Sequence, residues 1–167
     1  MIDISNAIEM ASCSDTGQVR SHNEDSVLAN ARLGLAVLAD GMGGYNAGEV
    51  ASGMATAVLG SELEHAFDNR APHQLTDSGA PLARAVLDDV IARTNAAIFQ
   101  AAQSQPQYAG MGTTLVAVQF YDDRLTVAHI GDSRLYRLRD GELAQLTRDH
   151  SLLQEQIDSG IITPEQA

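Results

Sequence analysis

Short apolar stretches typical of β-strands occupy the first forty residues. Residues 7–12 are mostly apolar, and residues 26–29 form a second short candidate. Leu33 to Ala39 is a continuous apolar run that ends at Asp40, a pattern typical of a strand buried on both faces. We therefore expect strands at all three places.

Helical periodicity follows a glycine-rich stretch at residues 41–48. Apolar residues then step by four positions, which predicts an amphipathic helix over residues 50–67. The residues that keep this step are Val50, Met54 and Val58, then Leu59, Leu63 and Phe67. A second long helix is predicted from residue 82 to a point before Pro106. Its apolar positions are Leu82, Val86, Leu87, Val90 and Ile91.

Strand-like alternation returns at residues 113–120 and again at residues 125–130. We interpret Thr113 and Thr114 as packing residues of a buried strand, because β-branched side chains are frequent there. Asp140-Gly141 predicts a two-residue hairpin, since both turn positions need positive φ. Strands, two helices and further antiparallel strands indicate an α+β fold in layers, with the helices on one face of a sheet.

Composition narrows the possible functions. The 167 residues suit one domain, and all ten basic residues are arginine, against 22 acidic residues and a net charge of −12. The absence of lysine excludes phosphate-loop, protein-kinase and Schiff-base chemistry. Because the arginines are scattered from Arg20 to Arg148, an acidic chain of this kind is not expected to bind nucleic acid.

Cysteine content and hydropathy indicate a reducing compartment. Cys13 is the sole cysteine, so an internal disulfide is excluded. We see neither an N-terminal signal segment nor an apolar run long enough to cross a bilayer. The expectation is a cytoplasmic protein without a membrane partner.

The last residues have the pattern of a helix start. In Thr163-Pro164-Glu165-Gln166 a capping residue precedes a proline at the first helical position, and a glutamine stands three residues after the cap. A single turn is unstable alone, so the pattern predicts a chain that ends inside a longer fold. The alternative is a frayed tail that forms no helix.

The segment Asp40-Gly41-Met42-Gly43-Gly44 is the strongest candidate for chemistry. An acidic residue at the end of a buried strand projects into the crevice at the sheet edge, and a following glycine can turn its carbonyl to the same point. Carboxylate and carbonyl oxygens together suit a hard cation such as Mg²⁺ or Mn²⁺. Alone, such a segment more often forms a strand-to-helix turn with an aspartate cap.

Two other polar segments carry similar chemistry. Gly131-Asp132-Ser133-Arg134 follows a predicted strand and by itself fits a turn. Arg20 lies five residues before Asp25; a guanidinium binds phosphate through paired donors, and a carboxylate can hold metal-bound water. By itself this segment fits a solvated loop.

Together these segments resemble successive signature blocks of the metal-dependent protein phosphatases of the protein phosphatase 2C type, in their compact bacterial form. The blocks, in the family's order, are residues 20–25, 40–44, 110–114 and 131–134, and residues 149–151 resemble the next one. The resemblance implies an α/β sandwich of two antiparallel β-sheets flanked by helices. It also implies that residues 1–167 form the N-terminal part of a single catalytic domain and end in its flap region.

The resemblance further implies roles for the matched residues. Asp40 would bridge two Mn²⁺ or Mg²⁺ ions, and Gly41 would bind one of them through its carbonyl oxygen. Asp25 would act on the metals through water, and Arg20 would bind the substrate phosphate. Asp132 would help to hold a third, weaker ion.

Two features depart from the family's pattern. Met42 stands where eukaryotic relatives have a histidine proposed as general acid, and a thioether cannot donate a proton. His22, His129 and His150 are possible proton donors, and none is assigned this role. The family's C-terminal Asp-Gly and Asp-Asn blocks, which complete the metal site, are absent from these residues.

The resulting hypothesis is hydrolysis of phosphoserine and phosphothreonine in proteins by a metal-activated water. The enzyme would oppose a bacterial Ser/Thr protein kinase and act on its targets. The alternative is a phosphatase-like binding or regulatory module that lacks the C-terminal metal aspartates. An aspartyl-phosphate hydrolase is excluded, because its second aspartate would fall at Leu38.

Overall fold

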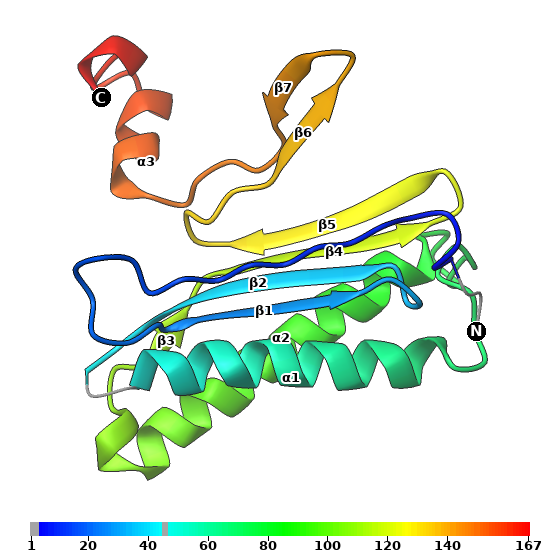
Figure 1. The fold of residues 1–167 in the computed structure, drawn as a ribbon, viewed down its shortest axis with the longest axis horizontal. Coiled ribbons are helices and arrows are strands. Elements are labelled where there is room, and N and C mark those ends of the chain that lie inside the picture. Colours follow the sequence, from blue (N-terminus) through cyan, green and yellow to red (C-terminus); the bar gives the residue numbers. More distant parts are fainter. Residues whose placement is uncertain (1–3, 45–46) are drawn as a thin grey trace.

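The computed structural model describes residues 4–44 and 47–167, so Tyr45 and Asn46 of the glycine-rich stretch lie outside the described residues. Two helices, α1 (Ala47–Phe67) and α2 (Leu82–Ser104), cover one face of an antiparallel sheet (Figure 1). The strands of that sheet are β1 (Asp25–Asn30), β2 (Leu35–Met42), β3 (Gly112–Thr113), β4 (Leu115–Tyr121) and β5 (Arg124–Ile130). Their order is β1-β2-β4-β5, with β3 paired to the end of β2. The predicted α+β class is confirmed.

The C-terminal quarter of the chain lies on the side of the sheet opposite to α1 and α2 (Figure 1). It contains the hairpin β6 (Tyr136–Arg139) and β7 (Glu142–Gln145), and helix α3 (Leu152–Asp158). The hairpin turn is the predicted one, because Asp140 has φ 52° and Gly141 has φ 81°. Short 3₁₀ turns occur at η1 (Pro106–Tyr108) and η2 (Pro164–Gln166), so the helix start predicted near the end forms a single turn with its capping box.

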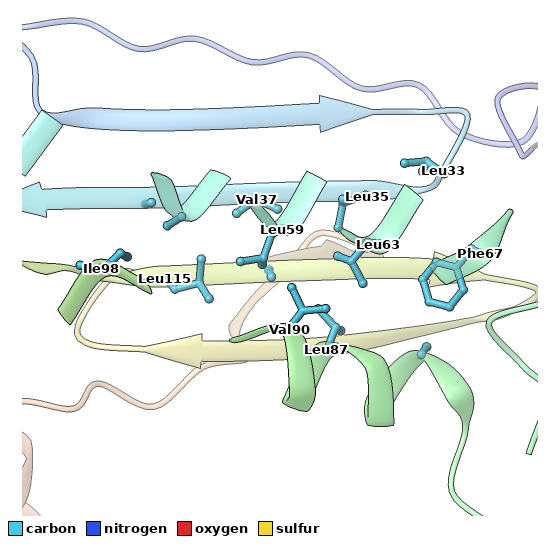
Figure 2. Close-up of a cluster of buried hydrophobic side chains, with 14 of the residues drawn as sticks. Leu33, Leu35, Val37, Leu59, Leu63, Phe67, Leu87, Val90, Ile98 and Leu115 are labelled. Atoms are coloured by element: carbon cyan, nitrogen blue, oxygen red, sulfur yellow. The ribbon is translucent and has the colours of Figure 1, made fainter. Parts of the chain in front are cut away.

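The hydrophobic core lies between the sheet and the two helices (Figure 2). Leu35 and Val37 point from β2 toward the helices and belong to the same buried cluster as Leu59 and Leu63 of α1 and Leu87 of α2. Both α1 leucines are fully buried. Full burial of such a side chain stabilises a fold by about 1.5–3 kcal/mol, so this layer holds the sheet on the helices.

Burial of β2 on both faces was predicted, and the structure contradicts this. Leu35, Val37 and Ala39 are buried, whereas Leu38 and Asp40 on the other face are exposed. The helices cover only one face of this strand in the described residues. Such one-sided cover produces alternating burial along an antiparallel strand.

The strand predicted at residues 7–12 is also absent, since β1 is the first strand of the described residues. An apolar stretch becomes a strand only when the edge of a neighbouring strand satisfies its backbone groups, and this segment has no such ladder. The predictions at residues 26–29 and 33–39 are confirmed as β1 and β2. The second of these strands begins two residues later than predicted and continues through Asp40 to Met42.

Candidate active site

Several strand ends meet at one end of the sheet, where β1 begins and β2 and β5 end (Figure 1). The register of β1 and β2 places Asp25 directly opposite Asp40. Residues directly opposite in an antiparallel pair project to the same face, so the two carboxylates are neighbours. Asp40 lies within β2 rather than beyond it, because β1 and β3 pair with the strand up to Met42.

The carboxyl group of Asp40 is in an environment that disfavours its charge. Partial burial raises the pKa of Asp40, and Asp25 raises it further through its charge and a hydrogen bond. The charges of Asp132 and Glu24 raise this pKa again. Acidic side chains from β1, β2 and the loop after β5 thus act on one another electrostatically. A nearby cation would relieve this repulsion.

A polar recess of about 170 Å³ opens beside these carboxylates. Arg20, Asp25, Asp40 and Gly41, all predicted as site residues, line it. The fifth predicted residue, Asp132, does not line the recess and reaches Asp40 through its charge. The five predicted residues are spread over more than a hundred positions of the sequence. The fold brings four of them to one recess and the fifth, Asp132, within electrostatic reach of it.

Glu24 is a site residue that the sequence reasoning missed. It lines the recess, and its Oε1 atom is buried without a hydrogen-bond donor. The nearest ionisable partner is His22, whose Nε2 lies 3.5 Å from that oxygen. The sequence offered one signal for Glu24, namely that its carboxylate directly precedes Asp25 in the same segment. Alternation along a strand would have turned that carboxylate away from Asp25, and only the structure shows that it faces the recess.

Backbone packing holds Gly41 in place. Its N–H donates to the carbonyl oxygen of Glu24 at 3.1 Å. A Cβ atom on Gly41 would collide with the carbonyl of Gly48 in the first turn of α1. Glycine at position 41 is therefore required by the close approach of α1 to β2, whatever role its carbonyl has in the site.

The donor set fits a divalent cation but does not enclose one. An unpartnered carboxylate oxygen at Glu24, the repelled carboxyl of Asp40 and the neighbouring Asp25 are hard oxygen ligands of the kind that Mg²⁺ and Mn²⁺ prefer. Among the described residues, no three His, Cys, Asp or Glu side chains form a group that could hold a metal ion. The described side chains alone thus do not enclose an ion, and we call this arrangement an open donor set.

The loop that carries Asp132 is fastened by an ion pair. Arg134 donates from Nε and Nη2 to both carboxylate oxygens of Asp149, at 2.6–3.0 Å. These hydrogen bonds lower the pKa of Asp149. The pair connects the loop after β5 to the segment that follows β7, two of the blocks singled out in the sequence.

The candidate proton donors are distributed unevenly. His22 lines the recess, whereas the rings of His129 and His150 lie against each other with centroids 4.6 Å apart. His129 Nε2 lies 2.8 Å from the carbonyl oxygen of Arg148, which ties that ring to the backbone. Met42 is 66% exposed and offers no proton.

A separate apolar pocket of about 440 Å³ lies between α2 and the β3 region. Its wall includes Met42, Phe99 and Met111, and none of its lining side chains is ionisable. This pocket therefore offers no group for acid–base or metal chemistry.

The sequence profile described as "Protein phosphatase 2C" matches residues 11–158 of the chain. The chain belongs to the protein phosphatase 2C family. Relatives within this family support the assignment along the whole sequence. The chain is 46% identical over 167 residues to the serine/threonine protein phosphatase PstP of Mycobacterium tuberculosis, covering all of this chain and 30% of PstP. It is 37% identical over 164 residues to the protein phosphatase PhpP of Streptococcus pneumoniae, covering 96% of this chain and 62% of PhpP.

Solved structures of this family have the same fold. The crystal structure of the M. tuberculosis phosphatase PstP superposes with a TM-score of 0.79 at 46% identity, over 93% of this chain and 60% of that one. A second structure, of the PstP catalytic domain in complex with two manganese ions, gives a TM-score of 0.78 over 62% of its length. The chain thus spans less than two thirds of these relatives. These matches confirm the predicted phosphatase 2C-like fold.

The described residues contain no helix that is both long and apolar enough to span a membrane.

Proposed function

We propose that the protein hydrolyses phosphoserine and phosphothreonine in proteins with the help of divalent metal ions. The observation that carries this proposal is the convergence of Asp25, Asp40, Glu24 and Arg20 on one polar recess. Carboxylates beside a guanidinium provide both a cation site and an anion site, which is the pairing that a phosphate ester and its metal ions need. The manganese-bound PstP relative supports the choice of metal.

Five of the residues that line the recess would each have a chemical task. Asp40 and the carbonyl of Gly41 would hold manganese or magnesium, with Asp25 and Glu24 acting directly or through water. Bound ions of this kind lower the pKa of a water and offset negative charge on a phosphate. Arg20 would bind and orient the substrate phosphate by paired hydrogen bonds.

Asp132 and Met42 have more restricted roles in this proposal. Asp132, outside the recess but within electrostatic reach of Asp40, would hold a third and weaker ion. Met42 does not protonate the leaving alkoxide, so that proton comes from water or from another group. His22 is the candidate histidine that lines the recess.

The acidic cluster needs further ligands to enclose its ions. We propose that these ligands come from residues outside this 167-residue chain, and that the chain would form the N-terminal part of one catalytic domain. Two observations support this proposal. The donor set is open, and the chain covers only 30%, 59% and 62% of the length of three of its relatives. The substrates would be phosphoproteins, the opposing enzyme a bacterial Ser/Thr protein kinase, and the compartment the cytoplasm.

An assay on a phosphothreonine peptide with Mn²⁺ tests the proposal. The protein extended beyond Ala167 should hydrolyse the peptide only when Mn²⁺ is present, and the 167-residue chain should turn over little. Full activity of the short chain would overturn the idea that ligands lie outside it. Absence of metal-dependent hydrolysis in the extended protein would overturn the proposed function.

Arg20→Ala tests the phosphate contact separately. Loss of charge-assisted hydrogen bonds should lower kcat/KM by about 10–100-fold while Mn²⁺ affinity stays unchanged. The matched control is Arg124→Ala, since the Arg124 side chain is 74% exposed at the turn between β4 and β5. Equal effects of both variants would remove Arg20 from phosphate binding.

A binding or regulatory module is the second candidate, and the open donor set favours it. Such a module would bind Mn²⁺ in a calorimetric titration of the extended protein without hydrolysing any phosphopeptide. Metal binding together with turnover would decide for the enzyme.

A further inference from the structure

Thr114 lies between β3 and β4, where the strand that carries Asp40 approaches the loop that carries Asp132. Its backbone N–H donates to the carbonyl oxygen of Asp40 at 2.9 Å. Its side-chain Oγ1 accepts from the N–H of Asp40 at 3.1 Å. Both backbone polar groups of Asp40 are therefore bound by one residue, 74 positions further along the chain.

The same hydroxyl also reaches the loop that carries Asp132. Thr114 Oγ1 lies 2.7 Å from Ser133 Oγ, in a hydrogen bond that either hydroxyl can donate. An uninterrupted path of two hydrogen bonds thus runs from the Asp40 N–H through Thr114 to the residue that follows Asp132. The hydrogen bond between Thr114 and Ser133 is short and partly buried, so water competes poorly with it.

The methyl group of Thr114 has a separate contact. Gly131 has φ 94°, a left-handed backbone that favours glycine. A Cβ atom on Gly131 would lie 2.8 Å from the Thr114 Cγ2 atom. The methyl therefore packs on the turn that leads into Asp132, while the hydroxyl joins that loop to Asp40.

The neighbouring Thr113 provides a contrast. Its Oγ1 donates to the Asp40 carbonyl at 3.0 Å and to the Thr114 carbonyl at 2.9 Å, and neither of these hydrogen bonds leads to residues 131–134. Both threonines thus form hydrogen bonds to the backbone of Asp40 in β2. Among these two, Thr114 is the residue that spans from Asp40 to the Asp132 loop.

We propose that Thr114 is a positioning residue of the active site, whose hydroxyl, through Ser133, fixes the Asp132 loop relative to Asp40. This inference rests on the proposed function, because it assigns Thr114 to the metal-holding carboxylates. Outer-shell residues of this kind orient the ligands without touching the metal themselves. The interpretation of Thr114 as a packing residue, made from the sequence, is incomplete.

Three variants of the extended protein, as defined for the phosphopeptide assay, separate the hydroxyl from the methyl. Thr114→Val keeps the shape and removes the hydroxyl, Thr114→Ser keeps the hydroxyl and removes the methyl, and Ser133→Ala removes the partner. The control is Thr126→Val, since Thr126 Oγ1 bonds Tyr121 Oη at 3.0 Å on the same sheet and away from the acidic cluster. Calorimetric titration with Mn²⁺ measures affinity, and NMR measures amide hydrogen exchange of Asp40 in the metal-free protein.

Thr114→Val should weaken Mn²⁺ affinity by about 10–100-fold and speed amide exchange at Asp40. Thr114→Ser should keep the affinity within about threefold of wild type, which is rescue by the conservative hydroxyl. Ser133→Ala should also weaken binding, and the Thr114→Val/Ser133→Ala double variant should bind no more weakly than Thr114→Val alone, because both changes break one path. Thr126→Val should match the wild type.

Other results would overturn the proposal. Unchanged Mn²⁺ affinity in Thr114→Val, or equal losses in Thr114→Ser and Thr114→Val, would assign the residue to packing alone. Fully additive losses in the double variant would show two independent contacts. If Thr114→Val fails to fold, Thr114→Ser and Ser133→Ala decide by the same criteria. A wild-type protein that binds Mn²⁺ but hydrolyses no phosphopeptide would overturn the proposed function and leave these comparisons intact.

Discussion

Asp40 and Asp149 are both aspartates at inter-segment contacts, and their surroundings act on them in opposite directions. Burial and neighbouring carboxylates raise the pKa of Asp40, whereas the Arg134 guanidinium lowers the pKa of Asp149. The ionised form therefore destabilises the metal-free fold at the first site and stabilises it at the second. The repulsion at Asp40 would be relieved by a cation, whereas Asp149 already has the Arg134 guanidinium beside it within the fold.

Asp40→Asn should have the largest effect on function. An amide has no charge to help hold a divalent ion, so metal-dependent turnover of the extended protein should fall by at least about 100-fold. Steady-state assays across Mn²⁺ concentrations measure this loss. Asp123→Asn is the matched control, because the Asp123 side chain is 88% exposed at the distant β4–β5 turn. Unchanged turnover in Asp40→Asn would remove Asp40 from its role.

Saturating Mn²⁺ should raise the Tm of the extended protein and leave that of Asp40→Asn nearly unchanged. A ligand that binds only the folded state stabilises it by about 2.7 kcal/mol when its concentration is 100 times Kd. Differential scanning calorimetry with and without Mn²⁺ measures the shift. An equal shift in both proteins would place the bound ion elsewhere.

Without metal, Asp40→Asn should be more stable than the wild type at neutral pH. A folded-state pKa above the unfolded value means that the folded protein binds the proton more tightly. Stability of the wild type therefore falls as pH rises from about the ordinary value of 3.8 through the raised pKa. The advantage of the variant should grow over this same interval and vanish below it. Thermal melts of metal-free protein between pH 3 and 8 measure this dependence, and a constant difference would contradict it.

Asp149→Asn should show the opposite behaviour. Loss of the hydrogen-bonded charge next to Arg134 should lower Tm by about 2–4 °C at neutral pH, with less than about tenfold change in Mn²⁺ affinity. Because the folded-state pKa of Asp149 is depressed, its stabilisation is present above the ordinary value near 3.8 and is lost as pH falls through the lower folded value. The Tm difference between variant and wild type should therefore disappear in acid. A difference that persists there would point to packing rather than charge.

Asp88→Asn should have the smallest effect. Its partner Arg84 is one turn away on α2 at 3.8 Å, and both side chains are 71% exposed. Exposed pairs of this kind contribute little, so Tm should change by less than about 2 °C. A fall in Tm as large as that of Asp149→Asn would contradict this. It would mean that any ion pair stabilises the fold equally, whether or not it is bidentate and partly buried.

Most of the fold could be predicted from local patterns. The helices over residues 47–67 and 82–104 follow from apolar spacing, and the Asp140-Gly141 turn follows from the need for positive φ. The errors concern partners. Residues 7–12 have an apolar pattern but no strand edge to pair with, and β2 has a continuous apolar run but cover on one face only. A single segment does not encode what lies on its second face.

The candidate site divides in a similar way. Arg20, Asp25, Asp40 and Gly41 were predicted from the order of their segments, and they line one recess. Glu24 was missed because its importance lies in an oxygen that no donor reaches, which is a property of the packed recess.

By itself, the sequence of this protein determined the helices, the turns and the identities of the charged residues that gather in the recess. These follow from backbone periodicity, from φ preferences and from the chemistry of side chains, all of which act over a few residues. The tertiary structure alone decided that Asp25 faces Asp40, that Arg134 neutralises Asp149, and that Thr114 joins Asp40 of β2 to the loop that carries Asp132. Strand register and loop placement set those distances, and they arise from contacts between segments far apart in the chain.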